Sequence, residues 1–188
     1  MKQKDHKALA YFLLDGVRDR HLWKRSWHRR FFLVGCVIPD YIPFTYLRGF
    51  RKSRAMRGHN QPYSGEHIRK SMEKLQLGGV NRFRDCFRLG TLMHYLADSF
   101  TFPHTVGFEG SMRDHRQYER ELHTLFSQYL ARLDFKHSLA LPMETALSDF
   151  LCRSRAEYEK REQGCEGDCR QIVSACAGVF HALCCKSI

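Results

Sequence analysis

Two pairs of side chains of the kind that bind divalent metal ions are each spaced four residues apart. His94 and Asp98 form the first pair, and His115 and Glu119 form the second. Side chains four residues apart on a helix project from the same face about one turn apart, so each pair can clasp one ion. His104 lies between the pairs, directly after a proline. Imidazole and carboxylate groups are zinc ligands, and a catalytic zinc site keeps one coordination position for water.

Each pair alone has a simpler explanation, a hydrogen bond on the surface of a helix. His94 and Asp98, however, lie in a strongly apolar segment, where unpaired polar groups would be costly. Two such pairs and an intervening histidine fall within 26 residues. The combination favours a metal site.

The segment 81–102 should carry the first pair as a central helix. Its apolar residues cluster on one side at helical spacing: Leu89, Leu92, Met93, Leu96 and Phe100. Gly90, His94 and Asp98 fall on nearly the opposite side, so both faces would be in contact with other parts of the chain. Pro103 disfavours helical geometry at the residue before it and should end the helix.

Further helices are expected over residues 6–20, 65–76, 112–133, 142–161 and 168–185. Residues 28–38 form a short apolar segment that Pro39 should end, and Ser64 should cap the helix over 65–76, which stops at two glycines. Ser111 and Asp114 have the spacing of a capping box. Residues 41–65 form a basic, aromatic stretch without clear periodicity. We therefore predict one all-α, multi-helix domain over residues 1–188.

The charge is unevenly distributed. Residues 1–90 carry 20 Lys and Arg against 7 Asp and Glu, a net charge of +13, while residues 91–188 carry 11 against 13, a net charge of −2. The basic half can attract phospholipid headgroups, with peripheral membrane contact, or nucleic acid, or it can simply be a solvated surface. No signal peptide or membrane-spanning segment is evident, so we expect a cytoplasmic protein with reduced cysteines. Nothing indicates an obligate protein partner.

The run "LGTLMHYLADSFTFPHT" resembles the core motif of the zinc-dependent phospholipase C family, His-x3-Asp-x5-His followed by His-x3-Glu. Upstream, "VGCVIPD" resembles the family's Gly-x3-Pro-Asp element, and "DHKALAYFLL" resembles its N-terminal helix with a ligand histidine. The resemblance extends from residue 6 to about residue 130. It implies an all-helical zinc hydrolase with two or three zinc ions.

The resemblance also implies a ligand set: His6, Asp40, His59, His94, Asp98, His104, His115 and Glu119. One zinc would be held by Asp40, His94, Asp98 and a histidine after the 41–65 stretch. A second would be held by His104, His115 and Glu119, and Asp98 would bridge to a third with His6. The histidine after the stretch is His59 or His67, and we prefer His59 because His67 lies in a segment that looks like an ordinary amphipathic helix.

One feature departs from the family pattern. The secreted phospholipases complete the third site with the α-amino group of an N-terminal tryptophan, whereas this chain begins with Met1. The occupancy of the third site, and with it the substrate preference, therefore stays open.

The implied reaction is hydrolysis of a phosphodiester such as a phospholipid by a zinc-activated water, with Asp40 as a candidate to accept the proton of the water. One alternative is a nuclease, because the fungal single-strand-specific zinc nucleases are similar in fold and metal arrangement. The basic segments lack interleaved aromatics that clearly indicate a base-stacking platform, which argues against it. Another alternative is a non-catalytic, zinc-stabilised domain that binds membranes.

Overall fold

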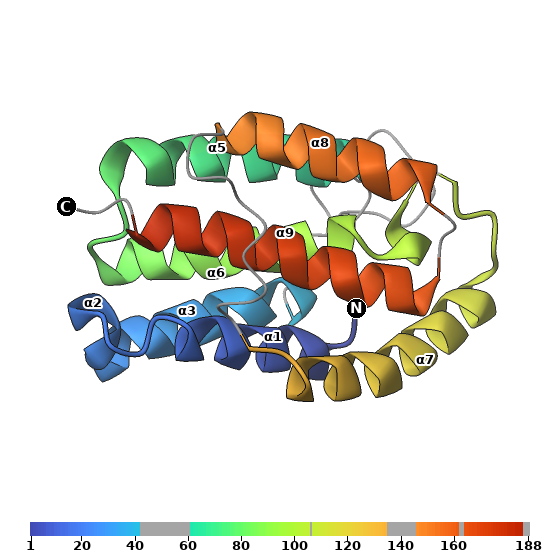
Figure 1. Cartoon of the computed structure of the whole chain (residues 1–188), viewed down its shortest axis with the longest axis horizontal. Helices are drawn as coiled ribbons and strands as arrows, with labels where there is room; N and C mark the ends of the chain where they lie inside the picture. Colours follow the sequence, from blue (N-terminus) through green and yellow to red (C-terminus); the bar gives the residue numbers. More distant parts are fainter. Residues whose placement is uncertain (42–60, 106, 135–145, 162–163, 186–188) are drawn as a thin grey trace.

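The computed structural model describes residues 1–41, 61–105, 107–134, 146–161 and 164–185, and these residues form helices and connecting turns without a β-strand (Figure 1). The elements are α1 (Gln3–Asp15), α2 (His21–Lys24), α3 (Ser26–Tyr41), α5 (Gln61–Gly78), α6 (Phe83–Ser99), the short 3-10 helix η1 (Phe102–His104), α7 (Met112–Ala131), α8 (Leu147–Lys160) and α9 (Cys165–Cys185). The prediction of an all-α protein is confirmed.

Helix α6 lies at the centre of the bundle. It packs against α3, α5 and α9, and Figure 1 shows α3 and α5 on either side of it with α9 in front. Its residues are buried on both faces, the apolar side at Leu89 and Leu92 and the polar side at His94 and Asp98. The central position predicted for this helix is therefore confirmed.

The contact between α3 and α6 is made by backbone atoms at two glycines. A Cβ atom on Gly35 would lie 2.3 Å from the carbonyl oxygen of Phe87, and one on Gly90 would lie 2.2 Å from that of Phe32. Both distances are far inside van der Waals contact, so only glycine fits at either position. This close approach places the C-terminal end of α3, and with it Asp40, beside the polar side of α6.

Two helix boundaries differ from prediction. Helix α3 continues through Pro39 to Tyr41, because a proline this close to the end of a helix removes only one late hydrogen bond and its ring is buried against the core. Helix α5 begins at Gln61, so Ser64 lies inside the helix and does not cap it. The capping box is confirmed, since the Ser111 hydroxyl accepts a hydrogen bond from the Asp114 backbone N–H and the Asp114 carboxylate accepts one from the Ser111 backbone N–H.

Aromatic side chains from three helices fill the interior away from the polar side of α6. Trp23, Phe32 and Phe180 are fully buried, and their ring centroids lie 5.3 to 5.7 Å apart. Every cysteine whose side chain is described is a free thiol. None of the described helices combines the length and the apolar character that crossing a bilayer requires.

Candidate metal centre

Three side chains from α1 and α6 converge in the interior; we call them the first triad. The Asp98 carboxylate lies 3.3 Å from Nε2 of His6 and 3.4 Å from Nε2 of His94. The two imidazole rings stack with centroids 4.0 Å apart, and all three residues are almost fully buried. Helix α1, ninety residues earlier in the chain, thus supplies one member of the group.

Helix α3 orients His94 of the first triad through its backbone. Nδ1 of His94 donates a hydrogen bond to the carbonyl oxygen of Cys36, 3.0 Å away. This contact fixes the ring and leaves Nε2, the atom nearest to Asp98, in the unprotonated form that binds a metal ion. Nε2 of His94 also lies 3.7 Å from Oδ1 of Asp40, whose side chain is 15% exposed. Asp40 therefore lies at the solvent-facing edge of the triad.

A second triad forms beside the first from η1 and α7. Glu119 lies 3.3 Å from Nε2 of His115 and 3.8 Å from Nε2 of His104. The break after α6 turns the chain back as predicted, although α6 ends at Ser99 and the proline is part of η1. The Glu119 side chain is 19% exposed, so this triad is more open than the first.

The α-amino group of Met1 lies between the two triads. Its nitrogen lies 2.9 Å from Asp98, 3.1 Å from Glu119 and 3.4 Å from Nε2 of His104. Burial lowers its pKa, but the two carboxylates outweigh this effect and raise the pKa to about 10. In this chain the amine thus occupies the place where the two groups meet.

The residues of both triads fit zinc in chemistry and in spacing. Zinc ligands lie about 2.1 Å from the ion, and tetrahedral geometry then separates two ligand atoms by roughly 3.4 Å. The four imidazole–carboxylate distances within the triads are 3.3, 3.4, 3.3 and 3.8 Å. Both ring nitrogens of His6 and Nδ1 of His115 are buried and form no hydrogen bond with any described residue. Buried polar atoms of this kind normally have a partner, and a bound cation would supply one for a nitrogen that faces it.

The electrostatics keep these groups in their metal-binding forms. Burial opposes the charge of Asp98, but the Met1 ammonium and the neighbouring histidines hold the pKa of this carboxyl well below its usual range. Burial likewise opposes ionisation of Glu119, while hydrogen bonds from His104 and His115 lower its pKa. Burial also lowers the pKa of His104. At neutral pH the carboxylates are therefore charged and His104 is neutral.

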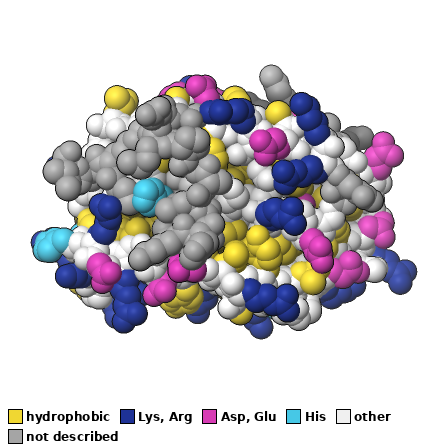
Figure 2. Space-filling model, viewed as in Figure 1, with side chains coloured by type: hydrophobic (Ala, Val, Ile, Leu, Met, Phe, Trp, Pro, Cys, Tyr) yellow, Lys and Arg dark blue, Asp and Glu magenta, His cyan; other side chains and the backbone are white. Residues whose placement is uncertain are grey.

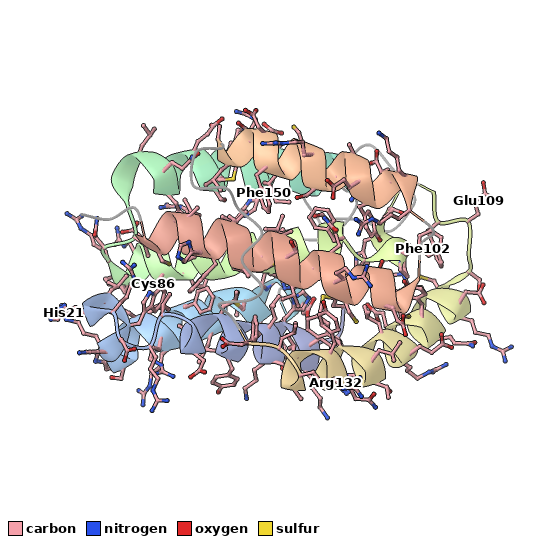
Figure 3. The ribbon with its side chains drawn as sticks, in the orientation of Figure 1. His21, Cys86, Phe102, Glu109, Arg132 and Phe150 are labelled. Atoms are coloured by element: carbon pink, nitrogen blue, oxygen red, sulfur yellow. The ribbon has the colours of Figure 1, made fainter. Side chains whose placement is uncertain are left out.

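A buried carboxylate that the sequence analysis missed holds the second triad in place. Asp168, at the start of α9, accepts hydrogen bonds from the backbone N–H of Phe102 at 2.8 Å and from the hydroxyls of Tyr118 at 2.8 Å and Tyr158 at 2.7 Å. Phe102, labelled in Figure 3, opens η1 two residues before His104. Tyr118 directly precedes Glu119 on α7. Asp168 lies among other polar residues, Glu166, Arg170 and Gln171, so its neighbours in the sequence gave no signal of its role or of its partners.

Three histidines outside the triads bear on the ligand assignment. His59, the preferred ligand after the basic stretch, lies outside the described residues. The ring of His67, the alternative, contacts Tyr95 on α6 with centroids 4.6 Å apart. His123 pairs with the buried Asp5 of α1. His123 therefore ties α7 to α1.

Comparison with known proteins agrees with this geometry. The model of a family described as zinc-dependent phospholipase C matches residues 5–178. No curated protein and no solved structure matches the chain. The family match covers nearly the whole sequence and includes both triads as well as Asp40 and Asp168. The chain therefore belongs to the zinc-dependent phospholipase C family.

Proposed function

We propose that this protein hydrolyses the phosphodiester bond of a phospholipid at a zinc centre built from the two triads and Asp40. The observation that carries the proposal is the convergence of four imidazoles and three carboxylates from α1, α3, α6, η1 and α7 at the spacing of zinc ligands. A purely structural zinc site is closed and four-coordinate. A carboxylate-rich group with a half-open edge at Asp40 and Glu119 instead favours catalysis.

The ligand assignment follows the contacts. His6, His94 and Asp98 would hold one ion together with Asp40, and His104, His115 and Glu119 would hold a second. The Met1 amine lies between Asp98 and Glu119, so a third ion there would share Asp98 and would require the amine to lose its proton. Two or three ions are therefore proposed, and His59 keeps its place as the proposed additional ligand.

Zinc bound at these residues would lower the pKa of an attacking water and neutralise charge on the phosphoryl oxygens. Asp40 is the carboxylate nearest to solvent beside the first triad, and we assign it to accept the proton of the attacking water. The Cys36 carbonyl keeps the His94 ring from rotating during the reaction. The products would be a diacylglycerol and a phosphorylated headgroup.

The test combines metal analysis with three substrates. The purified protein should contain at least two zinc ions per chain, and it should hydrolyse a water-soluble chromogenic phosphodiester and a phospholipid. A chelator should abolish both activities, and added zinc should restore them. Preferential cleavage of single-stranded DNA would show the chain to be a nuclease instead.

The variant Asp98→Asn keeps the size of the side chain but removes the charge that both triads face. We expect turnover to fall by at least about a hundredfold and bound zinc to fall, with little change in helical content. Asp15→Asn, at an exposed position on α1, is the matched control and should leave both quantities unchanged. Full zinc and full activity in Asp98→Asn would refute the site assignment.

A further inference from the structure

Two adjoining hollows lie on the outer side of α3, α5 and α6. The larger, of about 660 Å³, is found where α3 and α5 both pack against α6, and the smaller, of about 500 Å³, surrounds Trp27. Phe31 and Phe83 line both, with ring centroids 4.9 Å apart, so the two hollows lie side by side. We call them together the basic groove, after the cations that line the larger one: Lys70, Lys74, Arg84 and Arg88.

Two of these four charges are not neutralised by neighbours. Lys70 pairs with Glu66 at 2.5 Å, and Arg88 pairs with Asp85 at 3.5 Å. Lys74 and Arg84 are exposed and form no ion pair with any residue the structure describes. By contrast, on the face seen in Figure 2, Lys and Arg are interspersed with Asp and Glu. The groove is therefore a locally positive surface that suits an anionic partner.

Large apolar side chains are exposed around the groove. Trp27 is 64% exposed, Val34 48% and Phe83 45%. Leu77 is 90% exposed, and helical periodicity places it on the same side of α5 as Lys70 and Lys74. Exposed apolar side chains that gather beside cations mark an interaction surface, and aliphatic and Trp side chains among Lys and Arg are typical of membrane-surface contacts.

The basic groove leads towards the metal centre. Thr91, which lines it, lies one helical turn before His94 on α6. The ring of Tyr95 contacts His67, which lines the groove, and His94, with centroid distances of 4.6 and 5.3 Å. On α3 the exposed residues Trp27, Val34 and Tyr41 share one side of the helix, and Tyr41 adjoins Asp40.

We infer that the basic groove, with its exposed apolar rim, docks the protein onto the surface of an anionic phospholipid bilayer. Lys74 and Arg84 would meet lipid phosphates, and Trp27 and Leu77 would enter the layer of headgroups and upper acyl chains. A nucleic acid would match the charge but would offer nothing to the aliphatic Leu77 and Val34. That the docked lipid is also the substrate rests on the proposed function; the docking itself does not.

The two tryptophans of the chain provide a direct readout. Trp23 is 1% exposed and should emit at constant wavelength, whereas Trp27 is 64% exposed and should report insertion. Vesicles of phosphatidylcholine with about one-third phosphatidylserine should shift the emission to the blue, and brominated lipids should quench it. Pure phosphatidylcholine vesicles should have a much smaller effect, and raised salt should weaken binding. An equal response to both vesicle types, or none to either, would overturn the inference.

A pair of double variants separates the groove from overall charge. Lys74→Glu/Arg84→Glu should weaken binding to the anionic vesicles by about tenfold or more. Arg153→Glu/Lys160→Glu, at exposed positions on α8, changes the net charge equally and should leave vesicle affinity within about twofold. Equal losses in both double variants would show that only net charge matters. Tighter binding of a single-stranded oligonucleotide than of vesicles, lost in the groove variant, would assign the groove to nucleic acid.

Activity measurements distinguish failure of the docking from failure of the proposed function. Lys74→Glu/Arg84→Glu should hydrolyse the soluble phosphodiester at the normal rate and lose activity only on anionic vesicles. Asp98→Asn should bind the vesicles normally and hydrolyse neither substrate. If the unaltered protein bound vesicles but hydrolysed neither substrate, the proposed function would be refuted and the docking surface would stand. If Lys74→Glu/Arg84→Glu hydrolysed anionic vesicles as fast as the unaltered protein, the docking surface would be refuted and the proposed function would stand.

Discussion

The two triads have similar ligands but are held in place by different forces. The first triad sits on long helices, α1 and α6, and its neighbour α3 touches α6 through the backbone at Gly35 and Gly90. The second triad depends on a three-residue helix, η1, whose first residue is held by a hydrogen bond to Asp168. Close packing should therefore make the first triad sensitive to added volume, and the polar network should make the second sensitive to a lost hydrogen bond.

Adding one methyl group at Gly90 should have the largest effect on stability and should weaken zinc binding at the first triad. In Gly90→Ala the new Cβ would overlap the Phe32 carbonyl oxygen, so α3 must move away from α6. We expect a loss of about 3 kcal/mol in the free energy of unfolding and weaker zinc binding at the first triad. Denaturant unfolding and zinc titration would measure both.

The control for this variant is Gly65→Ala, since a Cβ atom there would meet nothing within 4 Å. It lies in an exposed part of α5 and should be neutral or slightly stabilising. If Gly90→Ala were as stable as Gly65→Ala, the close packing of α3 against α6 would not be what positions the first triad.

Replacing the buried carboxylate of Asp168 should weaken zinc binding at the second triad. In Asp168→Asn the amide nitrogen cannot accept a hydrogen bond, so a donor among Phe102, Tyr118 and Tyr158 loses its partner. We expect a loss of about 2 kcal/mol of stability and zinc affinity at the second triad reduced about tenfold. A two-site zinc titration would show which triad is affected.

Asp19→Asn, at an exposed position before α2, is the matched control and should match the unaltered protein. Reduced affinity at the first triad, with the second unaffected, would contradict the division of roles between packing and hydrogen bonding.

Without metal, the stability should have a plateau in pH bounded by His104 of the second triad and by the Met1 amine between the triads. The pKa of His104 is lowered from 6.5 in the folded state, so its contribution is present above pH 6.5 and is lost as the pH falls through the lowered value. The pKa of Met1 is raised from 8.0 to about 10, so its contribution is present below pH 8.0 and is lost as the pH rises through 10. Outside the plateau, stability should fall by about 1.4 kcal/mol per pH unit for each proton involved.

Urea unfolding in the presence of a chelator from pH 2 to 11 would measure this profile. Below 3.8, protonation of Asp98 should cost further stability, since its pKa is also lowered in the folded state. A flat profile between pH 5 and 7 would mean that His104 does not titrate with unfolding.

Removing one hydroxyl should have the smallest effect. Tyr118→Phe leaves Asp168 two of its three hydrogen bonds, and we expect a loss of about 1 kcal/mol with nearly unchanged zinc binding. Tyr129→Phe, later on α7, is the control. A loss as large as that of Asp168→Asn would show that Tyr118, and not the carboxylate, organises this end of the bundle.

Sequence reasoning found the parts of the centre that follow a local period. The spacing of His94 and Asp98, and of His115 and Glu119, indicates a shared helix face whatever surrounds it. Contacts between distant segments left no such trace. The hydrogen bond from His94 to the Cys36 carbonyl spans 58 residues, and Asp168 lies 66 residues from its backbone partner.

The same limit applies to the surface. The sequence analysis found no aromatic platform among the basic segments, yet the fold brings Phe31 from α3 into one hollow with Arg84 from α6 and Lys74 from α5. Trp27 lines the adjoining hollow. Each helix supplies one or two members, so no single segment shows the pattern. The path of α3 through Pro39 was also missed, because the packing that tolerates the proline lies on other helices.

The glycine contact between α3 and α6 also bears on how the protein can change over evolutionary time. Side-chain rotamers can adapt to a substitution, but two touching backbones cannot, so the distance from Asp40 to His94 does not depend on which apolar residues fill the rest of this interface. The chain can therefore exchange most of its core residues while keeping its ligands in register. Gly35 and Gly90 make this exchange possible.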